Sequence, residues 1–211
     1  MTRLESRARL FACLLAALAG FIDAIGFIRS GGFFVSFMSG NSTRLGVGIA
    51  NHLRDGLLAC YLVVSFVGGV VLGSLVGETA GARRPAVVLA CAAALLGAAA
   101  WLDGSGATLK ALACLALAMG TMNTVFEREG EVRFGVTYMT GGLVRVGTGI
   151  ASSVRGRGSW AWTNNFFLWM TFVAGAVAGA KVYGPPPNLT LVTAAAAALG
   201  LAALSLRLNE V

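Results

Sequence analysis

Long apolar segments alternate with short polar ones along the whole chain. Six of the apolar segments approach the roughly 20 residues that an α-helix needs to cross the hydrocarbon core of a bilayer. They cover residues 10–28, 57–76, 86–102, 107–126, 160–180 and 189–206. The pattern therefore predicts an all-α polytopic membrane protein with six transmembrane helices.

Two further apolar segments, residues 32–50 and 134–152, have a different pattern. Each opens with aromatic and β-branched residues, is interrupted at a Ser-Gly or Thr-Gly pair, and then carries an arginine into a run of small residues. Irregular backbone at membrane depth is tolerated only where protein or a water-filled cavity surrounds it. We expect both segments to be broken and re-entrant, with full crossing of the membrane as the alternative.

The two halves of the chain repeat one another. Residues 20–23 (GFID) match 120–123 (GTMN), and residues 38–50 (MSGNSTRLGVGIA) match 139–151 (MTGGLVRVGTGIA). The match continues between residues 66–73 and 172–179, which share Phe-Val-x-Gly-x-x-x-Gly. Self-similarity of this kind indicates a duplication. We assign residues 1–104 to the first repeat and 105–211 to the second, within one integrated membrane domain.

Lys and Arg between the apolar segments predict the orientation of the chain, because cytoplasmic loops carry an excess of both. With Arg44 and Arg145 inside the broken segments set apart, the basic residues divide ten to four between the two sides if these segments are re-entrant, whereas full crossing gives eight against six. The larger asymmetry favours six spans and cytoplasmic termini. The ten are Arg3, Arg7, Arg9, Arg83, Arg84, Arg128, Arg133, Arg155, Arg157 and Arg207, and the four are Arg29, Arg54, Lys110 and Lys181.

Three spans in each repeat is an odd number, so the second repeat enters the membrane from the opposite side to the first. The predicted fold is therefore two inverted three-span repeats with two broken re-entrant segments. Inverted repeats whose interrupted segments meet near the midplane are a recurring architecture of transporters.

The composition is also that of a membrane protein. Hydrophobic residues make up 57% of the chain and charged residues 12%, too few to cover the surface of a soluble domain. The net charge of +7 would suggest nucleic acid in a soluble protein, but the basic residues lie mostly between the apolar segments. We expect the lipid bilayer as the main surroundings and no nucleic-acid partner. The four cysteines lie singly in apolar runs, so we expect no metal site and no cofactor.

The Ser39-Gly40 interruption is predicted to lie near the middle of the membrane. A helical arm from Gly32 to Ser39 would advance about 12 Å into a hydrocarbon core about 30 Å thick. Asn41 and Ser42 are common N-cap residues, so a short helix is expected to begin there with free N–H groups that point to the centre. These donors, the positive end of the helix dipole and Arg44 favour a negatively charged ligand.

Thr140, Gly141 and Arg145 occupy the matching places in the second repeat. Gly142 and Leu143 stand there in place of Asn41 and Ser42. We therefore expect two unequal half-sites, of which the first is the more polar.

Asp23 is an ionisable residue inside a predicted span, and such residues mark functional sites. We expect it within reach of Arg44. Two roles are open: a substrate contact or proton carrier, or one half of a buried ion pair that fastens the broken segment. Asn123 takes its place in the second repeat.

Two further patterns bear on function. Gly69, Gly73 and Gly77, with Gly175 and Gly179, form stripes of small residues that let helices approach closely, either between the repeats or in a homodimer. His52 is the only histidine, and neither His nor Lys lies near the serines of the first break to activate them, so we expect no enzyme.

Residues 20–24 (GFIDA), 34–44 (FVSFMSGNSTR) and 137–141 (TYMTG) resemble the bacterial YoaK family, a membrane family classed as a domain of unknown function. The resemblance covers nearly the whole chain. It implies an inner-membrane location and a transport role without an established substrate. The second break departs from the family pattern, with Gly142 where an Asn is commoner.

The leading functional prediction is an inner-membrane transporter or permease that binds a small anion or polar metabolite between the two broken segments. A channel on the same scaffold and a membrane scaffold that transports nothing are the alternatives. A cavity that reaches Arg44 and Arg145 would favour the first two over the third.

Overall fold

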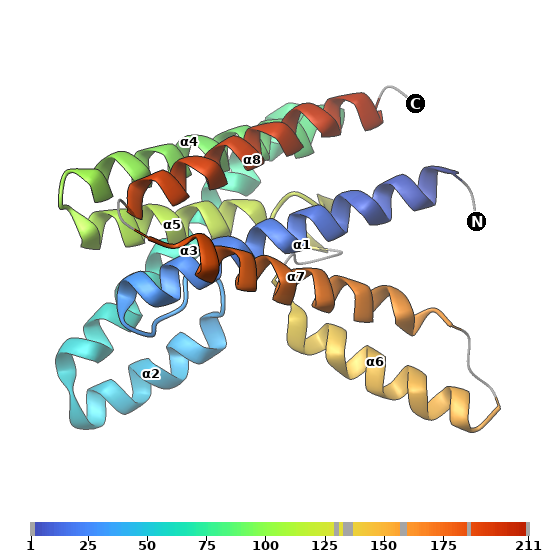
Figure 1. Cartoon of the computed structure of the whole chain (residues 1–211), viewed down its shortest axis with the longest axis horizontal. Helices are drawn as coiled ribbons and strands as arrows, with labels where there is room; N and C mark the ends of the chain where they lie inside the picture. The colour runs from blue at the N-terminus through green and yellow to red at the C-terminus, as the bar shows by residue number, and fades with distance from the viewer. Residues whose placement is uncertain (1–2, 129–130, 133–136, 157–159, 185–186, 210–211) are drawn as a thin grey trace.

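The computed structural model describes residues 3–128, 131–132, 137–156, 160–184 and 187–209 (Figure 1). Within these ranges the chain forms eight α-helices, one short 3-10 helix and one pair of two-residue antiparallel strands. The helices are α1 (Arg3–Ser30), α2 (Met38–Asn51), α3 (Leu53–Ala80), η1 (Gly81–Arg83), α4 (Arg84–Gly104), α5 (Thr108–Met122), α6 (Met139–Val154), α7 (Trp162–Val182) and α8 (Pro187–Asn209), and the strands are β1 (Glu127–Arg128) and β2 (Glu131–Val132).

Four stretches of the described chain are long and apolar enough to cross a membrane: Arg7–Arg29, Leu53–Gly104, Trp162–Val182 and Asn188–Arg207. The second of them contains both α3 and α4, which meet at η1, so the four stretches comprise five helices. The predicted helices at these places are confirmed, and the fold fits the predicted polytopic membrane protein.

The helix predicted over residues 107–126 is shorter than expected. It ends at Met122, and its 15 residues span only about 22 Å. Turns follow over residues 123–126, where the side chain of Asn123 bonds the Met119 carbonyl and that of Thr124 bonds the Thr121 carbonyl. Asn and Thr side chains compete with the helix for backbone groups, which the hydropathy pattern does not register.

Each repeat packs its first helix against a helix of the other repeat. Gly20 of α1 lies against the carbonyl of Phe172 in α7, so closely that a Cβ would overlap the oxygen. At the matching positions Gly120 of α5 lies against the carbonyl of Phe66 in α3, with the same overlap. The two contacts are copies of one another with the repeats exchanged.

The glycine stripes of α3 and α7 complete these contacts. Gly69 and Gly73 lie against the backbone of α5, and Gly175 and Gly179 lie against the backbone of α1. All four are buried within the chain. These four glycines therefore serve the contact between the repeats and do not offer the homodimer surface that was the alternative, whereas Gly77 lies against the side chain of Arg84 in its own repeat.

The remaining pair, α4 and α8, runs antiparallel, since Gly104 at the end of α4 lies beside Asn188 at the start of α8. Small buried side chains line this pair, among them Ala92, Ala99 and Ala198. Figure 1 shows α4 and α8 lying along one side of the molecule, with α2 and α6 on the opposite side.

The first broken segment begins differently from the prediction. The expected helical arm from Gly32 to Ser39 is wrong, because residues 31–37 form turns and bends and α2 begins only at Met38. Gly31 and Gly32 have φ of 73° and 108°, left-handed values that end α1 and favour glycine. Asn41 and Ser42 lie inside the first turns of α2 and are not its N-cap, which is Phe37.

Candidate functional site

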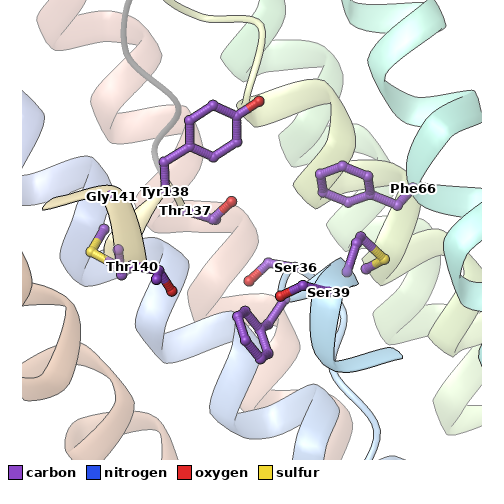
Figure 2. Close-up of a pocket in the computed structure, with 10 residues that line it drawn as sticks. Ser36, Ser39, Phe66, Thr137, Tyr138, Thr140 and Gly141 are labelled. Atoms are coloured by element: carbon purple, nitrogen blue, oxygen red, sulfur yellow. The ribbon is translucent and has the colours of Figure 1, made fainter. Parts of the chain in front are cut away.

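A cavity of about 480 Å³ lies where α2 and α6 begin (Figure 2). Both helices start at the centre of the molecule and run outward to opposite ends of it (Figure 1). Four matched pairs from the two repeats line the cavity, and Phe66 of α3 adds one aromatic ring. The pairs are Ser36 with Thr137, Phe37 with Tyr138, Met38 with Met139, and Ser39 with Thr140; Gly141 also lines it.

The lining of this cavity is uncharged and mostly apolar, and it includes the hydroxyl-bearing residues Ser36, Ser39, Thr137, Tyr138 and Thr140. In Figure 2 the side chains of Ser36 and Ser39 lie on one side of the cavity and that of Thr140 on the other. The first N–H groups of a helix have no partner within the helix, and together they form the positive end of its dipole. Two such ends, at Ser39-Gly40 and Thr140-Gly141, lie beside the cavity. The arrangement suits the oxygen atoms of a small polar ligand.

Asp23 of α1 holds the segment that precedes α2. Its Oδ1 accepts the backbone N–H of Val35 at 3.0 Å and that of Ser36 at 2.9 Å, and the residue is only 7% exposed. The carboxylate therefore fixes the backbone that presents Ser36 to the cavity.

The expected contact between Asp23 and Arg44 is wrong. The guanidinium of Arg44 lies over the ring of Phe33, 4.7 Å from its centroid, and neither ion pair found in the described chain involves either residue. Asp23 is surrounded by backbone donors of residues 35–36, which take the place of a cation.

Asn41 of α2 also holds the segment that precedes α2. Its Oδ1 accepts the N–H of Phe34 at 3.0 Å, and its Nδ2 donates to the carbonyl of Phe34 at 2.6 Å. The side chain thus pairs with one residue as a strand would, and it is fully buried. Asn41 is a positioning residue for the entrance of α2 and does not line the cavity.

Asn123 has the corresponding role in the second repeat. Its Oδ1 accepts the backbone N–H of Thr137 at 3.3 Å and the Thr137 hydroxyl at 3.1 Å. Its Nδ2 donates to the carbonyl of Met119 at 2.9 Å. A neutral amide suffices here because the two contacts with Thr137 need only an acceptor oxygen.

The other predicted site residues are divided between different places. Ser39, Thr140 and Gly141 line the central cavity as expected, and Gly40 lies in the same first turn of α2. The Ser42 hydroxyl is exposed and bonds the Met38 carbonyl. Arg145 lines a separate cavity between α6 and α7 and does not reach the centre.

Several lining residues were not predicted: Ser36, Phe37, Met38, Phe66, Thr137, Tyr138 and Met139. A signal for most of them exists in the sequence. Residues 36–38 (SFM) and 137–139 (TYM) match one another directly before the repeated Ser/Thr-Gly pair. Because two unrelated loops would not keep such a match, it points to equivalent surroundings in the two repeats.

Comparison with known proteins gives the family. The family model described as "Protein of unknown function (DUF1275)" matches residues 11–204. A relative from Rhizobium meliloti (strain 1021), UPF0700 transmembrane protein RA0705, is 36% identical over 199 residues, which is 92% of this chain and 84% of the relative. No solved structure gives a significant match. This protein is therefore a multi-pass membrane protein of the DUF1275 family, in agreement with its resemblance to YoaK.

Proposed function

We propose that this protein is a small transporter of the bacterial inner membrane that binds its substrate in the central cavity. One observation carries the proposal: the cavity is lined by equivalent residues of both repeats, at the starts of α2 and α6. Transporters of the inverted-repeat type place their substrate sites at this meeting point.

The proposed architecture is two inverted three-span repeats. Three observations support it: the exchanged contacts of Gly20 and Gly120, the antiparallel packing of α4 and α8, and both chain ends at one end of the molecule (Figure 1). A two-fold axis that interchanges antiparallel spanning helices lies in the plane of the membrane. The excess of basic residues near the termini makes that end the cytoplasmic one in this proposal.

The segments 32–50 and 134–152 are re-entrant in this proposal. The helices α2 and α6 have 14 and 16 residues, about 21 and 24 Å, which is short of the hydrocarbon core. Each starts at the centre of the molecule and runs to one end (Figure 1). Irregular residues 31–37 lead into α2, surrounded by α1 and by α2 itself, as unwound backbone in a membrane requires.

The substrate class that we propose is a small polar molecule or a small anion with oxygen acceptors. The hydroxyls of Ser39 and Thr140 support this, because they line the cavity from the two repeats at the starts of α2 and α6. A hydroxyl group can both donate to and accept from the polar groups of a ligand. No His or Lys lines the cavity to activate a hydroxyl, so we propose binding and transport without catalysis.

Transport by the full-length protein in liposomes tests the proposal. We expect saturable uptake of at least one solute from a panel of small radiolabelled anions and neutral polar metabolites. The double variant Ser39→Ala with Thr140→Val should lower that uptake at least tenfold, while the control Ser42→Ala, on an exposed face of α2, should transport normally. Uptake that does not saturate would indicate a channel, and no uptake of any solute would favour a scaffold.

A further inference from the structure

The two repeats differ where each broken helix packs against the next helix. In the first repeat, Gly48 of α2 lies so close to Gly56 of α3 that a Cβ would overlap the Gly56 backbone. In the second repeat, the matching Gly149 of α6 lies instead against the side chain of Trp162 in α7. Trp162 takes the place of Gly56, since each lies ten residues before the shared Phe66 or Phe172.

This replacement accompanies a second polar cavity. Because an indole stands where the first repeat has a hydrogen atom, α6 cannot approach α7 as closely as α2 approaches α3. A cavity of about 440 Å³ lies between α6 and α7, lined among others by Arg145, Ser152, Trp162 and Asn165. It is independent of the central cavity and of the transport proposal.

The groups that line this cavity include several hydrogen-bond donors. Arg145 makes no ion pair with any residue of the described chain, and the Nε1–H of Trp162 is buried without a hydrogen-bond partner. The Asn165 amide and the Ser152 hydroxyl add further donors, and no carboxylate lines the cavity. The positive charge of Arg145 beside several N–H and O–H groups is the chemistry that recognises an oxyanion.

The position of the cavity favours a ligand at the membrane surface. Trp160 and Trp162 stack with their ring centroids 6.0 Å apart, and Trp160 is 79% exposed. Tryptophan is enriched at the level of the lipid headgroups. The helix α6 also runs from the centre toward the end of the molecule where both termini lie (Figure 1).

We propose that the cavity between α6 and α7 binds a phosphate group, presented by an anionic phospholipid or by soluble phosphate. In this proposal the guanidinium of Arg145 pairs with two phosphate oxygens, and the indole of Trp162 turns so that its N–H donates to one of them. The first repeat has no equivalent site, because Gly48 and Gly56 are in contact and Arg44 lies on Phe33.

The test uses the full-length protein, stripped of lipid in detergent and labelled with ¹⁵N-tryptophan. The indole N–H signal of Trp162 is assigned with the variant Trp162→Phe. Dihexanoyl phosphatidylglycerol and inorganic phosphate are titrated separately. We expect a saturable shift of this signal, and Arg145→Gln should weaken the binding about tenfold to a hundredfold. The control Arg155→Gln removes an exposed charge next to α6 and should leave the affinity unchanged.

The outcomes separate the two sources of phosphate. A shift with the lipid that inorganic phosphate does not reverse identifies a headgroup site, and a shift with inorganic phosphate identifies a site for a soluble ligand. An unmoved Trp162 signal in both titrations overturns the proposal, as does equal weakening by Arg145→Gln and Arg155→Gln. If Arg145→Gln does not fold, the wild-type titration and Asn165→Ala, which should also weaken binding, decide the question.

Discussion

Asp23 and Asn123 occupy equivalent places in the two repeats. Each accepts a hydrogen bond from the backbone just before the next helix, α2 or α6. Asp23 accepts the N–H of Ser36 at 2.9 Å, and Asn123 accepts the N–H of Thr137 at 3.3 Å. A carboxylate and an amide thus perform the same structural task, for which a charge is not required. The charge of Asp23 is therefore either dispensable or reserved for a step that Asn123 does not perform.

The variant Asp23→Asn separates these two roles. We expect it to fold with a free energy of unfolding within about 1 kcal/mol of wild type, because the acceptor oxygen remains. Asp23→Ala should lose about 2–4 kcal/mol, since two buried N–H groups lose their acceptor. Denaturation by sodium dodecyl sulfate measures both. If Asp23→Asn folds but no longer couples uptake to a pH gradient, Asp23 is a proton carrier; unchanged coupling leaves it as a clamp.

Asn41 should matter more for stability than its neighbour Ser42. Removing the two bonds between Asn41 and Phe34 in Asn41→Ala is expected to cost about 2 kcal/mol. The matched control Ser42→Ala loses one exposed bond within α2 and should change stability by about 0.5 kcal/mol or less. Equal effects of the two changes would mean that the loop before α2 is held by other contacts.

The glycine contacts between the repeats can be tested in pairs. Gly20→Ala and Gly120→Ala each place a Cβ against a carbonyl oxygen, so each should destabilise the protein by about 1–3 kcal/mol. Gly97→Ala is the control: no atom lies within 4 Å of the new methyl group, and alanine favours a helix by about 0.5–1 kcal/mol. Thermal unfolding in detergent measures the stability of the three variants and so ranks them. A stable Gly120→Ala beside a damaged Gly20→Ala would argue against equivalent contacts.

Labelling of single cysteines with a membrane-impermeant reagent tests the topology. In a background where Cys13, Cys60, Cys91 and Cys114 are replaced by alanine, we expect Ser105→Cys to react from outside whole cells. Arg83→Cys and Arg155→Cys, both exposed, should react only after the cells are opened. Reaction of Arg83→Cys in intact cells would make the six-span arrangement untenable.

The sequence predicts the helices well, because hydropathy is a local property of each segment. It also predicts the place of the central cavity, because the two halves of the sequence can be compared directly. It misplaces the start of α2, since Ser39 to Ser42 look like a helix cap when read alone. The actual start depends on Asp23, which is distant along the chain and bonds the backbone of residues 35–36. No local pattern contains that contact.

The two arginines show the same limit. Arg44 and Arg145 match in the alignment and were expected to face a shared centre. One lies on Phe33 and the other in the cavity beside Trp162, because their surroundings differ at Gly56 and Trp162. The direction of a side chain depends on such packing, which a spacing argument does not include.

The exchanged contacts of α1 with α7 and of α5 with α3 bear on how such a chain could have arisen. A single repeat would expose the glycine surfaces of its first and third helices and could cover them only with a second copy. In the proposed inverted arrangement that copy would have to be inserted in the opposite orientation. An ancestral half-length protein would therefore have needed to insert into the membrane in two opposite orientations. Gene fusion would later have fixed one orientation for each half.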